Sequence, residues 1–227
     1  MRATKRTVGR ALVRDAFAIA AAVGVIGVSF GAIAVASGLP GWAAVAMSVL
    51  VFAGGSQFMA VGMLSAGNPV AAVLAGLLLN ARHLPFGMAV ADAVGSGRAA
   101  RLLGSHLLVD EAVAFAMAES DPARRRAAYW LTGGMLFALW QVGTVVGVAL
   151  GSAAGDPATL GLDAAFPAGL LALTLPSLRD RQTRRAALAG AALAVATTPV
   201  LPAGLPILLA LLGLVLALRP VDGARPC

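Results

Sequence analysis

Two long stretches of this chain carry almost no charge. Between Ala16 and Ala91 the only formally charged side chain is Arg82, and the stretch from Ala186 to Leu218 contains none. About 20 consecutive apolar residues are enough for a helix to span the hydrocarbon core of a bilayer. Only 12% of the 227 residues are charged, whereas a soluble domain usually carries about a quarter. The chain is therefore predicted to be all-α and membrane-embedded, with a single integral membrane domain over residues 1–227.

The expected spans are apolar runs separated by Gly, Pro and charge. Seven of them are clear, at residues 16–36, 42–65, 69–91, 127–151, 160–178, 186–200 and 205–218. An eighth run, residues 99–118, is interrupted by His106, Asp110 and Glu111, so it is predicted either to span the membrane or to lie at its interface. The sequence thus predicts a polytopic helical bundle of seven to eight segments, with one or two broken or re-entrant helices.

Positive charges predict the orientation, because loops rich in Lys and Arg face the cytoplasm. They gather in four places: residues 1–14, 124–126, 179–185 and the segment after 218. With all four inside, the N-terminal segment 1–15 and the tail 219–227 are cytoplasmic, eight spans are required, and Arg98 and Arg101 fall outside. In the alternative, the neutral turn at 65–68 joins two segments of which one is re-entrant.

Composition also excludes several classes of function. The net charge is +7, and the basic residues lie between apolar segments without interleaved aromatic residues. Membrane lipids with anionic headgroups are therefore expected as partners, and nucleic acid is not. Cys227 is the only cysteine, and the two histidines stand at unrelated positions. No metal, no cofactor and no pair of nucleophile and base is expected, so the chain is not predicted to be an enzyme.

The run from Ala53 to Phe58 places two glycines and two polar residues, Ser56 and Gln57, inside an apolar segment. A helix broken at membrane depth is tolerated only where protein or a watery cavity covers the break. Such a break would direct backbone groups and these two side chains at a solute, as half-helix ends do in secondary transporters. The alternative is close helix packing at the glycines, with Ser56 bonded to its own backbone.

A second polar group, Asn80-Ala81-Arg82-His83, interrupts the next apolar run. A charge near the middle of the bilayer costs on the order of 3 kcal/mol or more, so it usually marks a pathway or a partnered site. Arg82 is predicted to face a substrate carboxylate and His83 to carry a proton. Two alternatives stay open, since Arg82 either snorkels to an interface or pairs with one of three carboxylates: Asp92, Asp110 or Glu111.

Further polar residues stand in the eighth and fourth runs. His106 and Asp110 share one helical face, with Glu111 beside them. A buried carboxylate takes up a proton more readily, so Asp110 and Glu111 are candidates for proton coupling together with His83. If the run is interfacial, the same residues form a solvated face. Gln141 is predicted either to line a pore or to hydrogen-bond between helices.

Glycines recur every four residues at Gly143, Gly147, Gly151 and Gly155, and Gly27 and Gly31 repeat the spacing once. Such a small-residue stripe permits close approach of a second helix. It is interpreted first as packing within the chain, and second as the contact with a partner subunit.

Several of these blocks occur in an order that resembles the AzlC family of branched-chain amino acid permeases. The blocks are Met47 to Phe58, Asn80-Ala81-Arg82-His83, Leu108-Val109-Asp110-Glu111, Trp140 to Thr144 and Gly161 to Ala168. The resemblance covers nearly the whole chain. It implies a multi-pass exporter of branched-chain or similar amino acids in the cytoplasmic membrane, driven by the proton-motive force and working with a small AzlD-type membrane subunit.

Residues and resemblance together predict amino acid export. The substrate is expected to meet Ser56, Gln57, Asn80, Arg82, His83 and Gln141, with Asp110 as the proton carrier. The alternative is a channel-like or scaffold subunit whose transport function needs a small partner protein. A homo-oligomer also stays open.

Overall fold

The computed structural model of the chain describes residues 9–65, 67–154, 171, 175, 177–201 and 205–215. Within them the chain forms helices and no strand, which confirms the all-α prediction. The elements are α1 (Arg10–Ala36), α2 (Gly41–Val51), α3 (Gly54–Ser65), α4 (Pro69–Asn80), α5 (His83–Ala89), α6 (Ala91–Val94), α7 (Arg98–His106), α8 (Asp110–Met117), α9 (Pro122–Ala154), the 3₁₀ turn η3 (Ser177–Arg179), α11 (Arg181–Thr197), α12 (Leu205–Ala210) and η4 (Leu211–Gly213).

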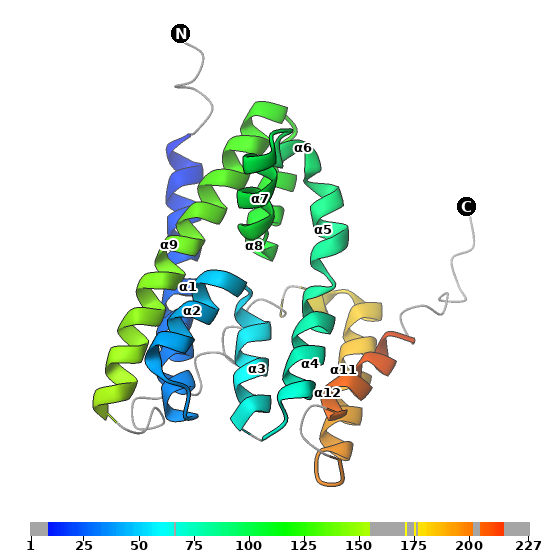
Figure 1. Ribbon diagram of the computed structural model, residues 1–227. Helices are drawn as coiled ribbons and strands as arrows, with labels where there is room; N and C mark the ends of the chain where they lie inside the picture. The colour runs from blue at the N-terminus through cyan, green and yellow to red at the C-terminus, as the bar shows by residue number, and fades with distance from the viewer. Residues whose placement is uncertain are drawn as a thin grey trace, which may run out of the picture.

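Three stretches of the described chain are long and apolar enough to cross a membrane: Arg10–Ala36, Pro69–Ala89 and Pro122–Ala153. They correspond to the predicted spans 16–36, 69–91 and 127–151. The second span begins where local chemistry favours a helix start, because Pro69 occupies its first turn and the Asn68 side chain accepts a hydrogen bond from the Ala71 N–H at 3.0 Å. Figure 1 shows α1 and α9 side by side along much of their length.

The glycine stripe is buried in the contact between α1 and α9. A Cβ atom built at Gly143, Gly147 or Gly151 would lie 2.0–2.9 Å from backbone atoms of α1. A Cβ atom at Gly27 or Gly31 would lie 2.9 or 2.2 Å from a backbone carbonyl oxygen of α9. These glycines therefore pack within the chain, and Gly155 lies outside the described residues.

Residues 41–65 form a helical hairpin instead of the predicted single span 42–65. As α2 proceeds from Gly41 to Phe52 it passes α9 in the opposite direction, from Val148 through Thr144 to Phe137. The chain then reverses, and α3 returns toward the end from which α2 started (Figure 1). Phe137 stands near the middle of the apolar part of α9, so this first hairpin reaches about halfway along that candidate span and returns.

Residues 98–117 form a second hairpin, which enters from the opposite side. At Gly104 α7 accepts a hydrogen bond from the Tyr129 hydroxyl at 2.7 Å, and at its end the His106 ring lies 5.5 Å from that of Phe137. The helix α8 then leads back toward the start of α9 (Figure 1). The run predicted at 99–118 therefore consists of two short helices that run in opposite directions.

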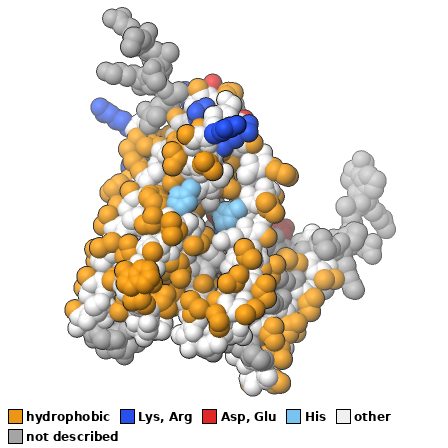
Figure 2. All heavy atoms as spheres, viewed as in Figure 1, with side chains coloured by type: hydrophobic (Ala, Val, Ile, Leu, Met, Phe, Trp, Pro, Cys, Tyr) orange, Lys and Arg blue, Asp and Glu red, His pale blue; other side chains and the backbone are white. Residues whose placement is uncertain are grey.

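The two hairpins correct the predicted topology. Each returns the chain to its own end of the bundle, so residues 9–154 contain three candidate membrane spans, and Arg98 and Arg101 lie at the same end of the bundle as Arg10 and Arg14. The prediction that Arg98 and Arg101 lie on the opposite side from the N-terminus counted 42–65 and 99–118 as full spans, and the structure has a pair of short helices in each place. Figure 2 shows Lys and Arg side chains gathered at the N-terminal end of this face and the two histidines at mid-height.

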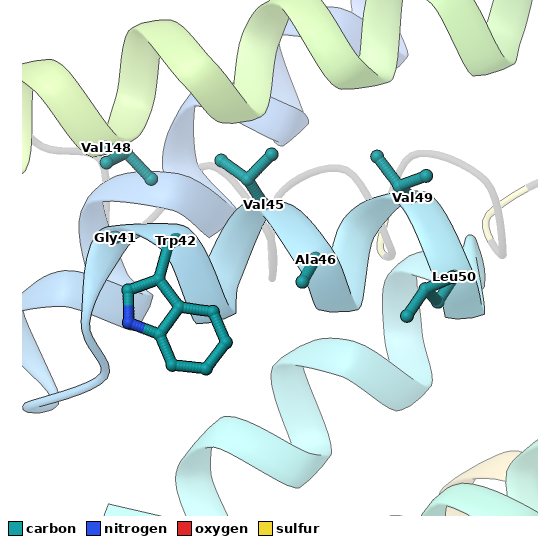
Figure 3. A pocket seen from close by; sticks show the side chains of 7 residues that line it. All are labelled: Gly41, Trp42, Val45, Ala46, Val49, Leu50 and Val148. Carbon is teal, nitrogen blue, oxygen red and sulfur yellow. The ribbon is translucent and has the colours of Figure 1, made fainter.

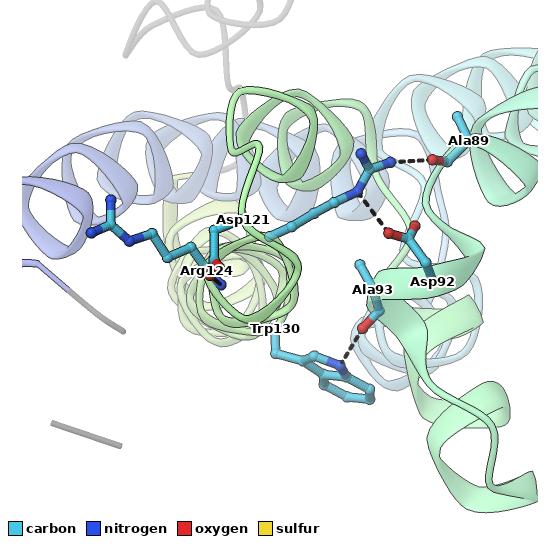
Figure 4. A network of polar contacts seen from close by, with 7 residues as sticks. Ala89, Asp92, Ala93, Asp121, Arg124 and Trp130 are labelled. Carbon is cyan, nitrogen blue, oxygen red and sulfur yellow. Dashed lines mark hydrogen bonds and ion pairs between the residues drawn. The ribbon is translucent and has the colours of Figure 1, made fainter. Parts of the chain in front are cut away.

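Polar contacts hold the short helix α6 against the start of α9 at this basic end (Figure 4). Arg125 forms an ion pair with Asp92 at 3.3 Å and donates a hydrogen bond to the Ala89 carbonyl. The Trp130 indole N–H donates to the carbonyl of Ala93 at 3.3 Å. These contacts fix the position from which α7 begins.

The described C-terminal helices pack on one another. A Cβ atom at Gly190 would lie 2.6 Å from the carbonyl oxygen of Ala210, and one at Gly213 would lie 2.5 Å from that of Ala186. The predicted span 186–200 corresponds to α11, and 205–218 corresponds in part to α12 and η4. Most of the predicted span 160–178, residues 1–8 and the tail 219–227 lie outside the described residues.

Candidate functional site

The tips of the two hairpins meet beside the middle of α9. The ring centroids of Phe52 and His106 lie 6.2 Å apart, and the Phe137 ring contacts both, at 5.0 and 5.5 Å. Two half-length helix pairs that enter from opposite sides therefore touch through aromatic rings at membrane depth. Hydrocarbon contains no water that could hydrogen-bond to irregular backbone, so such backbone must be covered by protein. At this contact each hairpin tip is covered by the other.

The first tip breaks where the sequence predicted a break. Phe52 has a φ of 40°, in the left-handed region, which ends α2. The Ala53 N–H donates to the Gln57 side-chain oxygen at 3.0 Å, and the Ser56 hydroxyl donates to the Ala53 carbonyl at 3.0 Å. Ser56 thus bonds to the local backbone, as its alternative interpretation held. The backbone groups freed by the break are satisfied by side chains one turn later.

The glycines at this tip are not forced by close packing. A Cβ atom at Gly54 would lie 3.6 Å from the Trp140 ring, and one at Gly55 would lie 3.5 Å from the Leu79 side chain, both ordinary contacts. The close-packing alternative is therefore not supported. The glycines place the start of α3 between α9 and α4 without filling the space around it.

Gln57 and Gln141 bring unpaired amide groups to this region. Gln57 is fully buried, and its Nε2 has no hydrogen-bond partner among the described residues. The Gln141 Nε2 donates to the Ser48 carbonyl of α2 at 3.2 Å, while its Oε1 is buried without a partner in the same part of the chain. Gln141 therefore links α9 to α2, and its side-chain oxygen is left as an unpaired acceptor among the described residues. Buried unpaired polar atoms are costly, and they concentrate where a solute or water supplies the missing partner.

Arg82 lies in the two-residue break between α4 and α5 and pairs with Asp110, the first residue of α8. The Nη1 to Oδ2 distance is 3.3 Å, and the two side chains are 41% and 43% exposed. Of the three carboxylates considered for Arg82, the structure selects Asp110, because Asp92 pairs with Arg125 at the basic end. Asp110 follows the tip of the second hairpin, where Leu107 lies against Gly133 of α9, so this ion pair lies along the apolar part of that candidate span.

Three other polar residues named from the sequence, Asn80, His83 and Glu111, are close in the chain to one member of this ion pair. The His83 Nδ1 lies 3.0 Å from the Asn80 carbonyl oxygen, while the Asn80 Oδ1 is buried and unpaired among the described residues. The Asp110 Oδ1 is likewise buried without a hydrogen-bond partner there. Glu111 is half-buried in the first turn of α8. The structure thus brings Arg82 and Asp110 together. It leaves two buried acceptor oxygens without a partner among the described residues, one on Asn80 and one on Asp110.

Sequence reasoning did not include the aromatic contact between the hairpin tips. Phe52, His106 and Phe137 are separated widely in the chain, and nothing in their spacing shows that they meet. His106 was singled out only as a neighbour of Asp110. The signal that was available is the scarcity of charge, which singles out Arg82 as the only formally charged residue between Ala16 and Ala91.

An apolar groove lies elsewhere, on the outer face of the first hairpin (Figure 3). Its lining comes from one face of α2 and from α9: Gly41, Trp42, Val45, Ala46, Val49, Leu50 and Val148. Trp42 and Leu50 are 75% and 74% exposed, as expected of side chains that face lipid or another apolar surface. No group of three metal-ligating side chains occurs in the part of the chain that the structure describes.

Comparison with known proteins identifies the family to which the chain is similar. The family model described as "AzlC protein" matches residues 18–154, which include both hairpins and the ion pair. The chain is 27% identical over 207 residues to the "Branched-chain amino acid transport protein AzlC" of Bacillus subtilis (strain 168), covering 88% of this chain and 81% of that protein. No solved structure matches the chain significantly.

Proposed function

The chain belongs to the AzlC family of membrane transport proteins, and we propose that it exports branched-chain or similar small apolar amino acids across the cytoplasmic membrane, driven by the proton-motive force. The observation that carries the proposal is the meeting of two hairpin tips beside an ion pair at membrane depth. Discontinuous helices of this kind form solute sites near the bilayer midplane in secondary transporters. The Bacillus subtilis relative is named as a branched-chain amino acid transport protein.

The proposed site consists of Ser56, Gln57, Asn80, Arg82, His83 and Gln141. Arg82 supplies a fork-shaped cation for a carboxylate, while the buried amides of Gln57 and Gln141 supply a donor and an acceptor. Leu108, two residues before Asp110, brings an apolar side chain to α5, since a Cβ atom at Gly87 would lie 3.6 Å from it. Asp110, Glu111 and His83 are the candidates for carrying the proton.

The basic end is proposed to face the cytoplasm. Arg98, Arg101 and the arginines at 124–126 lie there with Arg10 and Arg14, and an excess of positive charge marks cytoplasmic loops. The first hairpin then enters from outside and the second from the cytoplasm. A substrate bound between the tips is reached from outside along the first hairpin and from the cytoplasm along the second, from one side at a time.

Counterflow of labelled leucine, isoleucine and valine into proteoliposomes tests this function. The chain is reconstituted alone and with a small AzlD-type membrane subunit, with and without an imposed pH gradient. We expect counterflow of all three, and accumulation of leucine only with the gradient. The Arg82→Ala variant is expected to lose counterflow, whereas Asp92→Asn, which removes an ion pair of the same 3.3 Å length outside the site, is expected to keep it.

The second candidate function is a channel-like or scaffold subunit that acts only with its partner. The observation in its favour is the exposed apolar groove of α2, which offers a second membrane helix an apolar surface. Flux through the chain reconstituted alone excludes this candidate. Flux that requires the small subunit, with Arg82→Ala as active as the wild-type chain, supports it instead.

A further inference from the structure

The ion pair of Arg82 and Asp110 carries one charge of each sign at a depth where unpaired charge is costly. The cation comes from the break between α4 and α5, and the anion comes from the start of α8. Removing one partner of such a pair leaves the other uncompensated, which is far more costly than replacing both together. A solute that enters here is therefore favoured if it matches both charges at once.

We propose that the α-carboxylate and α-ammonium groups of one amino acid insert between these two side chains, so that Arg82 binds the carboxylate and Asp110 binds the ammonium. This inference rests on the proposed function and names the chemical class that the site selects, the zwitterion. Net charge at the site is zero with the pair closed and zero with the amino acid bound. Exchange between the two states therefore leaves no uncompensated charge in the membrane.

The geometry allows the exchange. The Asp110 Oδ1 is buried without a hydrogen-bond partner among the described residues, so the carboxylate has an acceptor to offer while its Oδ2 faces Arg82. Arg82 lies between α4 and α5 and its side chain is 41% exposed, which leaves it room to reorient. Two charge-assisted hydrogen bonds of about 2.8 Å, one at each end of the zwitterion, require the pair to open from 3.3 Å to roughly 6–8 Å.

A proton competes with the substrate at Asp110. Neutral Asp110 forms no ion pair with Arg82 or with an ammonium group, so a proton and the ammonium group compete for this carboxylate. Arg82 forms the ion pair with it, Glu111 follows it on α8, His83 follows Arg82 in the chain, and His106 ends α7. Mutually exclusive occupancy is what an exchanger of substrate for proton needs, and this is the direction of coupling that export requires.

Competition against labelled leucine counterflow tests the inference. The competitors are unlabelled leucine, 4-methylpentanoate, which lacks the ammonium group, and 3-methylbutylamine, which lacks the carboxylate. For the wild-type chain we expect both analogues to compete about 10- to 100-fold less well than leucine, because each leaves one member of the ion pair without a partner. An analogue that competes as well as leucine overturns the inference without the need for any variant.

The isosteric variant Asp110→Asn gives the second arm. In this variant 4-methylpentanoate is expected to compete to within about 3-fold of leucine, since an uncharged residue 110 no longer forms an ion pair with an ammonium group. The concentration of leucine at half-saturation is expected to depend less on pH than in the wild-type chain. The Asp92→Asn variant, whose ion pair lies at the basic end, keeps the wild-type preference and pH dependence.

The outcomes separate the two proposals. If Asp110→Asn discriminates leucine from 4-methylpentanoate as strongly as the wild-type chain does, Asp110 does not bind the ammonium and the inference is wrong, while export itself survives. If the wild-type chain shows no leucine counterflow alone or with the small subunit, the proposed function fails, and the inference fails with it.

Discussion

Replacing Gly147 by alanine tests the contact that fixes the register of the two longest spans. A Cβ atom there would lie 2.0 Å from the Val28 carbonyl oxygen, whereas ordinary contact begins near 3.4 Å. The helices α1 and α9 must therefore separate locally by more than 1 Å. Gly134 on the same helix is a matched control, because a Cβ atom there would meet nothing within 4 Å.

The magnitude follows from two opposing effects. Overpacking a closely packed contact costs about 1–3 kcal/mol, and alanine in place of glycine gains up to about 1 kcal/mol in helix preference. We expect Gly147→Ala to lower the free energy of unfolding by about 1–2 kcal/mol. Gly134→Ala is expected to leave it unchanged or to raise it by up to about 1 kcal/mol, because only the helix preference changes.

The assay is unfolding in mixed micelles, followed by circular dichroism as the fraction of denaturing detergent rises. The two variants make the same chemical change on one helix, so the difference between their free energies of unfolding isolates the contact with α1. Equal stability of Gly147→Ala and Gly134→Ala would refute the described register and return the glycine stripe to the alternative of a partner-subunit contact.

Three smaller changes are expected to act as follows. Tyr129→Phe removes a buried 2.7 Å hydrogen bond to the Gly104 carbonyl and should cost about 1–2 kcal/mol in the same unfolding assay, so unchanged stability would contradict that bond. A double-mutant cycle with Ser48→Ala and Thr144→Ala, whose hydroxyl oxygens lie 3.1 Å apart, should give about 0.5–1.5 kcal/mol of coupling, and additive effects would exclude the contact. The backbone N–H three residues after Asp180 donates to its carboxylate and lowers the pKa of that group, so the first turn of α11 should be protected above the ordinary carboxyl pKa and lose protection as pH falls through the lowered one. Amide exchange of that turn checks this, and Asp180→Asn should abolish its pH dependence.

Much of the site was predictable because charge is scarce in this chain. Arg82 and Asp110 stand out as ionisable residues within apolar runs, and the glycine and glutamine run at 53–58 predicted a break that the structure confirms. Which carboxylate Arg82 meets was not predictable. Asp92 and Asp110 are both acidic residues close to apolar segments, and the choice depends on where each helix begins in space. Their roles in binding and proton coupling stay predictions.

The topology shows the same division. Apolar runs of about 24 and 20 residues, at 42–65 and 99–118, satisfy the length of a membrane span, yet both turn back halfway. In the first, the left-handed conformation of Phe52 is held by ring contacts with His106 and Phe137, which come from other elements. Length and hydropathy are properties of one segment, and they do not record such contacts.

The sequence by itself determined that the chain is helical, that the membrane is its solvent, and that a few polar residues stand at membrane depth, because these follow from composition and local order. Only the tertiary structure decided which apolar runs cross and which return, and that the cation of one break faces the anion of another. Those outcomes depend on contacts between residues far apart in the chain, whose free energy no single segment contains.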